Sequence, residues 1–168
     1  MKKIFIASFC FCMISLFNSC KKESSTCPEH YTGSDCSEQI TPSQITLTKI
    51  EVTGFPATES AGGGWDNNDG PDIFPVLLQG ANDLVNAESS YIEDANFNTD
   101  YIWTLGTPLS LNASSQYVLG LYDYDDFDPN DTMGEVSFKP YSSTGGFPAT
   151  KEISGNGISF RLYLTYSF

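Results

Sequence analysis

The sequence predicts an all-β domain over residues 45–168, built as a two-sheet antiparallel β-sandwich of about eight strands. The composition favours this class, because 14 glycines and 9 prolines supply turns while threonine and tyrosine favour strands. Hydrophobic residues form 40% of the chain, which is enough for a folded core. Segment 158–168 alternates apolar and polar residues throughout, which is typical of a strand with one buried and one solvated face.

The remaining strands are predicted from the same pattern. In the first strand the apolar phase switches between Leu47 and Ile50, which predicts a bulge midway along it. Segment 73–78 is apolar enough to be a buried strand, and Pro75 favours an edge position for it. Segment 82–89 is either a short helix or a loop. Further strands are predicted at 91–92, 101–105, 117–122 and 134–138.

An acidic loop joins predicted strands 117–122 and 134–138, and its aspartates are Asp123, Asp125, Asp126, Asp128 and Asp131. Carboxylates this close repel one another unless water or a cation screens them. Asp123 and Asp125 are two residues apart in an extended segment, so their side chains point to one face. A turn at Pro129-Asn130 can return Asp131 to them. Three converging carboxylates suit calcium, which takes about six to eight oxygen ligands; the alternative is a solvated acidic loop.

A second acidic stretch reads WDNNDGPDIF over residues 65–74 and places Asp66 and Asp72 six residues apart. The glycine-containing turn between them is flexible enough to bring both carboxylates to one place. The two acidic loops can share one site if the strands beside them are neighbours in a sheet. The predicted calcium ligands are Asp66, Asp72, Asp123, Asp125 and Asp131, with Asp69 and Asp128 as candidates for additional ligands.

These two loops resemble the calcium-binding loops of the C2 domain, the family of calcium-dependent membrane-targeting modules. The later loop matches the family pattern aromatic-D-x-D-x5-D-x2-G-E at Tyr122, Asp123, Asp125, Asp131, Gly134 and Glu135. The earlier loop matches at Asp66 and Asp72, and the order of the two loops agrees over 45–168. The resemblance implies a C2-like sandwich that binds Ca²⁺. A strand leading straight into the first loop and a C-terminal strand closing the sheet suggest the type II topology.

In the C2 family, calcium bridges the protein to phospholipid headgroups, while apolar loop tips enter the bilayer beside basic residues. Phe127 occupies such a tip, where it would contact a membrane or a partner, but its neighbour is Asp126. Each basic residue near an anionic surface contributes about 1 kcal/mol, and these loops contain none. We therefore expect the calcium-bound domain to bind a protein or glycan partner. Calcium-dependent phospholipid binding and a metal-free structural or adhesive role are the alternatives.

The N-terminus has the features of a lipoprotein signal peptide over residues 1–19. Lys2 and Lys3 precede an apolar run at 4–17 that is too short to span a bilayer as a permanent helix. The sequence LFNSC, which ends at Cys20, resembles a bacterial lipobox. The resemblance implies lipidation of Cys20 and an anchor in the cell envelope, most simply the outer membrane. The alternative is an ordinary secretory signal with an incidental cysteine.

Between the anchor and the domain we expect a lipidated tether at 20–26, a disulfide loop at 27–36 and a flexible linker at 37–44. An envelope location permits Cys27 and Cys36 to pair. The segment CPEHYTGSDC resembles the closing hairpin of an EGF-like module, of which only this last loop is present. A metal site at Cys27, His30 and Cys36 would lack a fourth ligand.

Charge and residue types limit the classes of function. The formal net charge of −13 directs the chain away from nucleic acid and toward cations or basic partners. A glycosidase needs two acids whose environments separate their pKa values, whereas these acids are clustered without a Cys, His or Lys partner. Neither loop has the glycine and glutamate of an EF-hand. We therefore predict a binding module and no enzyme.

Overall fold

The computed structural model describes residues 27–59, 62–66, 69–127 and 129–168. The predicted signal peptide, the tether, the lipidation site Cys20 and the candidate ligand Asp128 therefore lie outside the described residues. Among the described residues, no helix has the length and apolar character needed to span a bilayer.

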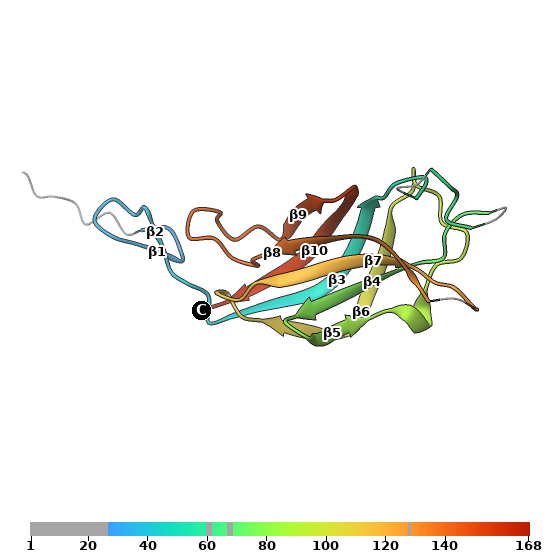
Figure 1. The fold of residues 1–168 in the computed structure, drawn as a ribbon. Coiled ribbons are helices and arrows are strands. Elements are labelled where there is room, and N and C mark those ends of the chain that lie inside the picture. Colours follow the sequence, from blue (N-terminus) through green and yellow to red (C-terminus); the bar gives the residue numbers. More distant parts are fainter. Residues whose placement is uncertain (1–26, 60–61, 67–68, 128) are drawn as a thin grey trace, which may run out of the picture.

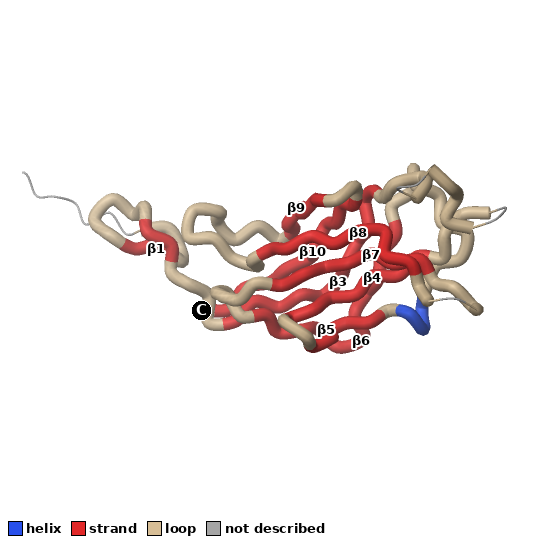
Figure 2. The backbone as a smooth tube through the Cα atoms, viewed as in Figure 1, coloured by secondary structure: helices blue, strands red, loops and turns tan. Residues whose placement is uncertain are grey.

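The domain is a sandwich of two antiparallel four-stranded sheets, as predicted (Figures 1 and 2). One sheet has the order β6-β3-β10-β9 and the other has the order β5-β4-β7-β8. The eight strands are β3 (Gln44–Gly54), β4 (Ile73–Gln79), β5 (Asn82–Asn86), β6 (Tyr101–Leu111), β7 (Tyr117–Asp123), β8 (Asp131–Phe138), β9 (Thr150–Gly155) and β10 (Ile158–Ser167). A single 3₁₀ turn, η1 (Glu88–Ser90), follows β5.

The core lies between the two sheets and is formed by the apolar positions of each alternation. On β10 the core-facing residues are Phe160, Leu162 and Leu164, all at most 3% exposed. The bulge predicted in the first strand is confirmed, because the pairing of β3 with β6 changes register between Leu47 and Lys49. The shift keeps apolar residues on the buried face along the whole strand, since it restores the phase of the alternation.

Three strand predictions were wrong. β4 is not an edge strand, since β5 and β7 flank it; Pro75 is tolerated because it lies just beyond the pairing with β5, which ends at Val76↔Asn86. Segment 82–89 forms β5 and the start of η1. Residues 91–92 make only an isolated bridge, in which Ile92 pairs with Ile73.

The strand connections place three loops at one end of the sandwich. These loops are 55–72 between β3 and β4, 87–100 between β5 and β6, and 124–130 between β7 and β8. They form the right-hand end of the molecule in Figure 1. β3 leads directly into the first loop and β10 pairs with β3, which is the strand arrangement behind the type II prediction.

A small disulfide-bonded hairpin packs against the opposite end of the sandwich. Cys27 and Cys36 are bonded, and β1 (Tyr31–Thr32) pairs with β2 (Glu38–Gln39). β2 lies inside the segment predicted as a flexible linker, and that part of the prediction was wrong. Backbone bonds hold the segment in place, because Ile40 N donates to His30 O. His30 also stacks on Phe168 with ring centroids 3.5 Å apart, and this contact fixes the position of the hairpin against the domain.

Candidate functional site

The three loops at the right-hand end of Figure 1 are in direct contact with one another. Ala95 N in the second loop donates to Pro71 O in the first at 2.8 Å, and Tyr124 N in the third donates to Asp72 O at 2.8 Å. A Cβ on Gly70 would lie 2.7 Å from Ala95 O, so only glycine permits this approach of two backbones. The acidic residues of all three loops are therefore held on one surface.

Asp123, the last residue of β7, is a fully buried carboxylate beneath these loops. Its Oδ1 accepts a hydrogen bond of 2.6 Å from Asp72 N, whereas its Oδ2 is buried and has no hydrogen-bond partner among the described residues. Burial raises the pKa of Asp123 to about 7; the Asp72 N–H opposes this rise, and the charges of Asp66, Asp125 and Asp72 add to it. An ionised Asp123 is therefore unfavourable unless a positive charge approaches it.

Three more of the predicted ligands line one recess beside Asp123. Asp66, Asp72 and Asp125 face a volume of about 260 Å³. Partial burial raises the pKa of Asp66, and the neighbouring Asp72 charge raises it further. The backbone of this region is held by side chains, since Asp125 N donates to Asn130 Oδ1 at 3.1 Å. The two acidic stretches of the sequence thus meet at one place.

Asp131 and Asp69 lie in neighbouring recesses. Asp131 is opposite Asp123 in the strand register, but it is exposed and faces a recess that it shares with Glu59 and Trp65. Asp69 lines a second acidic recess with Asp66, Asp72, Glu93 and Asp94. Phe127 extends from the third loop and is 98% exposed.

The second loop adds acidic groups that the sequence analysis did not identify. Glu93 and Asp94 contribute two carboxylates to the surface, and Asp94 N donates to Asp72 Oδ1 at 3.0 Å. Asp94 adopts φ 51°, a left-handed conformation that aspartate tolerates better than most residues. In the sequence, the signal for these two ligand candidates is an adjacent acidic pair directly after an apolar segment. It lacks the spaced pattern that marked the other two loops.

The donor set suits a hard divalent cation, because it consists of carboxylates and includes a buried oxygen without a partner. The arrangement is not a finished cage. Across residues 27–168, apart from the gaps at 60–61, 67–68 and 128, no three His, Cys, Asp or Glu side chains are grouped so that they could hold a metal ion.

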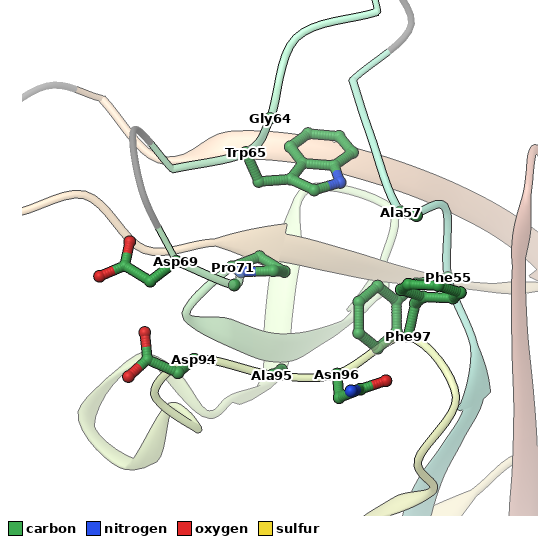
Figure 3. Close-up of a pocket in the computed structure, with 11 residues that line it drawn as sticks. Phe55, Ala57, Gly64, Trp65, Asp69, Pro71, Asp94, Ala95, Asn96 and Phe97 are labelled. Carbon is green, nitrogen blue, oxygen red and sulfur yellow. The ribbon is translucent and has the colours of Figure 1, made fainter.

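A pocket of about 290 Å³ with both aromatic and acidic residues in its lining adjoins the acidic surface, between the first and second loops (Figure 3). Trp65 covers one side of it, while Phe55 and Phe97 close the end away from Asp69 and Asp94. The Trp65 indole N–H donates to Pro56 O at 2.8 Å, which fixes the ring. Phe97 is 48% exposed, so the pocket presents aromatic surface beside the carboxylates.

No protein-family profile matches the sequence, and a search of curated proteins finds no match either. Solved structures do resemble the fold. A structure described as a C2 domain has a TM-score of 0.50 and 19% identity, covering 74% of this chain and 98% of its own. A C2 domain protein from Ramazzottius varieornatus has a TM-score of 0.44 and 15% identity, covering 74% of this chain and 88% of its own. A structure of two C2 domains of Extended-Synaptotagmin 2 has a TM-score of 0.42 and 10% identity, covering 98% of this chain and 48% of its own. The first of these likenesses identifies the fold of this chain as a C2-like β-sandwich.

Proposed function

We propose that this chain is a lipid-anchored protein of the bacterial cell envelope, whose C2-like domain binds calcium and contacts a protein or glycan partner. The observation that carries the calcium proposal is Asp123. A fully buried carboxylate with a partnerless oxygen, surrounded by further carboxylates, is costly in the absence of a cation. A divalent cation at this point would remove the cost.

Calcium would be held by Asp123 together with Asp66, Asp72 and Asp125, and Asp131 and Asp69 are candidates for further ligands. The bound ion would supply positive charge that neutralises the loops. The loop residues themselves would form the contact surface, with Phe127 at its tip. The pocket beside Trp65 offers a second point of contact for the same partner.

Thermal unfolding with calcium and with EDTA tests the metal site. At a calcium concentration 100 times the dissociation constant, the stability gain is about 2.7 kcal/mol. We expect Asp123→Asn combined with Asp125→Asn to abolish the gain. The matched control, Asp35→Asn with Glu38→Gln, removes the same charge from exposed side chains of the disulfide hairpin and should keep this gain. Equal melting curves of the wild type with calcium and with EDTA would refute calcium binding and leave a metal-free structural or adhesive role.

The envelope location rests on the sequence before Cys20, which lies outside the described residues. Cys20 is the proposed attachment point for the lipid. Intact mass spectrometry of the membrane fraction should find acyl chains on an N-terminal peptide that begins at Cys20. The same measurement on Cys20→Ser should find an unacylated chain, and an unmodified wild-type peptide would refute the anchor.

Calcium-dependent phospholipid binding is the second candidate, and the exposure of Phe127 favours it. The lack of lysine and arginine in all three loops weighs against it, because basic residues near anionic headgroups supply much of such binding. Sedimentation of the unlipidated protein with vesicles of mixed neutral and anionic lipid separates the two. Calcium-dependent co-sedimentation that Phe127→Ser removes would favour the phospholipid proposal.

A further inference from the structure

The outer face of sheet β5-β4-β7-β8 carries an apolar recess that the acidic loops do not use. Phe74, Val76 and Leu78 alternate along β4 with the core-facing Ile73 and Leu77, so they point away from the other sheet. They form the floor of a cavity of about 370 Å³, which we call the sheet recess. A solvated sheet face is ordinarily polar, so this apolar floor departs from the usual pattern.

The aromatic wall of the sheet recess is Tyr122, and its position depends on Gly120. A Cβ on Gly120 would lie 2.7 Å from Tyr122 Cε2, so the ring lies flat across the glycine. It also stacks on Phe74 with centroids 5.7 Å apart and planes at 24°. The hydroxyl donates to Glu135 Oε1 at 3.0 Å. The recess is therefore bordered by an aromatic ring that is held in place.

The rim of the sheet recess offers mostly hydrogen-bond acceptors. Asn130 Nδ2 already donates to Glu88 Oε1, and Asn130 Oδ1 accepts from Asp125 N. Asn86 Oδ1 accepts from Glu88 N. The carboxylates of Asp83 and Glu88 keep acceptor capacity and negative charge at the mouth of an apolar cavity. A ligand that fits this rim donates hydrogen bonds, carries positive charge and has an apolar portion.

The four described strands of this sheet, β5, β4, β7 and β8, contain no lysine or arginine. Lys49 and Arg161 belong to the other sheet, where Arg161 pairs with Glu51. Arginine from another molecule has the required chemistry: an aliphatic stem for the floor, a planar guanidinium that stacks on aromatic rings, and five donors for carboxylates.

We propose that the sheet recess binds an arginine side chain from a basic segment of a partner protein, with the guanidinium between Tyr122 and the carboxylates of Asp83 and Glu88. The aliphatic stem would lie along Val76 and Leu78. This assignment names the partner class that the proposed binding function left open and rests on that function. It does not require calcium.

Titration with tetra-arginine and with uncharged tetra-citrulline, followed by NMR chemical shifts and calorimetry, tests the assignment. We expect tetra-arginine to move the Tyr122 and Leu78 signals and to bind at least about tenfold more tightly than tetra-citrulline. Asp83→Asn with Glu88→Gln should weaken tetra-arginine binding about tenfold. The glutamine still offers Asn130 an oxygen. The matched control is Asp35→Asn with Glu38→Gln, which removes the same charge from two exposed residues of the disulfide hairpin and should retain most of the affinity.

Glycine substitutions test the aromatic wall separately from charge. Gly120→Ala displaces the Tyr122 ring and should weaken tetra-arginine binding severalfold. Gly106→Ala is the control, because no atom lies within 4 Å of its Cβ position. If Gly120→Ala fails to fold, Tyr122→Leu removes the ring instead and should show the same loss.

Three results would overturn the assignment: equal affinity for tetra-citrulline, equal losses in the rim variant and its charge control, or binding of cellotetraose that moves the Tyr122 signals. The last would identify the recess as a glycan site. Calcium-dependent melting of the same rim variant separates this inference from the proposed metal site. Tetra-arginine failing while calcium still stabilises the protein refutes only the sheet recess, whereas a melt that ignores calcium refutes only the metal site.

Discussion

Replacing the buried Asp123 by asparagine should make the metal-free protein more stable at neutral and alkaline pH. Asparagine has nearly the same shape and keeps an oxygen for the Asp72 N–H, but it carries no charge to desolvate. In the wild type the carboxyl must ionise inside the fold as the pH rises, next to the negative charges of Asp66 and Asp125.

The expected effect is large. The pKa of Asp123 rises from its ordinary value of 3.8 to about 7 in the folded state. The folded protein thus holds this proton more tightly, so the stabilisation is full below pH 3.8 and is lost as the pH rises through about 7. At about 1.4 kcal/mol per pH unit, the interval of about 3 units corresponds to about 4 kcal/mol. Asp66, whose pKa is also raised, adds to the loss in the same direction.

Urea denaturation in EDTA, at about pH 5 and about pH 8, measures this difference. The wild type should lose several kcal/mol between the two pH values, and Asp123→Asn should lose much less because only Asp66 and other groups still titrate. The variant should therefore exceed the wild type in stability at the higher pH. The burial argument would be contradicted if both proteins lost the same free energy of unfolding between the two pH values, or if the variant were less stable at both.

Three further substitutions probe contacts elsewhere in the domain. Gly70→Ala should cost about 1–3 kcal/mol by pushing the first loop off Ala95 O, which urea denaturation measures; alanine at a solvent-open glycine should cost much less. Arg161→Met leaves the buried Glu51 without its cation and should lower stability by about 2–4 kcal/mol at neutral pH; an unchanged midpoint would mean that the pair contributes nothing. Phe147→Ala removes a ring that contacts both His30 and Phe168, so NMR relaxation should find the disulfide hairpin moving independently of the sandwich.

The sequence allowed prediction of those features that have a strong period or a spaced motif. Alternation along β10 and the phase switch in β3 predicted the sandwich and its bulge, because burial of one face fixes both. β9 was not predicted: it is an edge strand with one buried residue, Ile153, so little of its alternation is enforced. Pro75 favoured an edge position for β4, but β4 is internal. The pairing of β4 with β5 ends at the residue after Pro75, and where it ends depends on the length of β5.

In the acidic site too, the spaced motif could be predicted from the sequence, whereas the folding of the loops could not. The spacing of the aspartates predicted the meeting of Asp66 and Asp72 with Asp123 and Asp125, since their strands β4 and β7 are paired. Asp131 is in register with Asp123 but faces a neighbouring recess, because a side chain at a strand end can turn outward. The contribution of Glu93 and Asp94 depends on how the second loop folds over Pro71, which no local pattern encodes.

The two ends of the sandwich lie at different distances along the chain from the predicted anchor at Cys20. The disulfide hairpin and the acidic loops lie at opposite ends of the domain (Figure 1). β10 alone contains 10 residues and so is about 33 Å long, whereas the seven residues of the proposed tether at 20–26 reach at most about 25 Å. With lipid on Cys20, as proposed, the tether holds the hairpin end of the domain near the bilayer, so the acidic loops point away from that bilayer when the domain stands upright on it.

If Cys20 is lipidated and the loops bind calcium, both as proposed, this geometry predicts that the calcium-bound loops contact a surface other than the bilayer that holds the anchor. Lipidated protein in vesicles, labelled with a polarity-sensitive dye at Phe127→Cys, should show no calcium-dependent entry of the dye into its own bilayer. Lengthening segment 20–26 with about 15 glycine and serine residues should permit entry only if the loops have affinity for lipid. Entry without the added residues would mean that the domain lies flat on its own membrane, and the loops would then have to face the lipid instead of a partner beyond it.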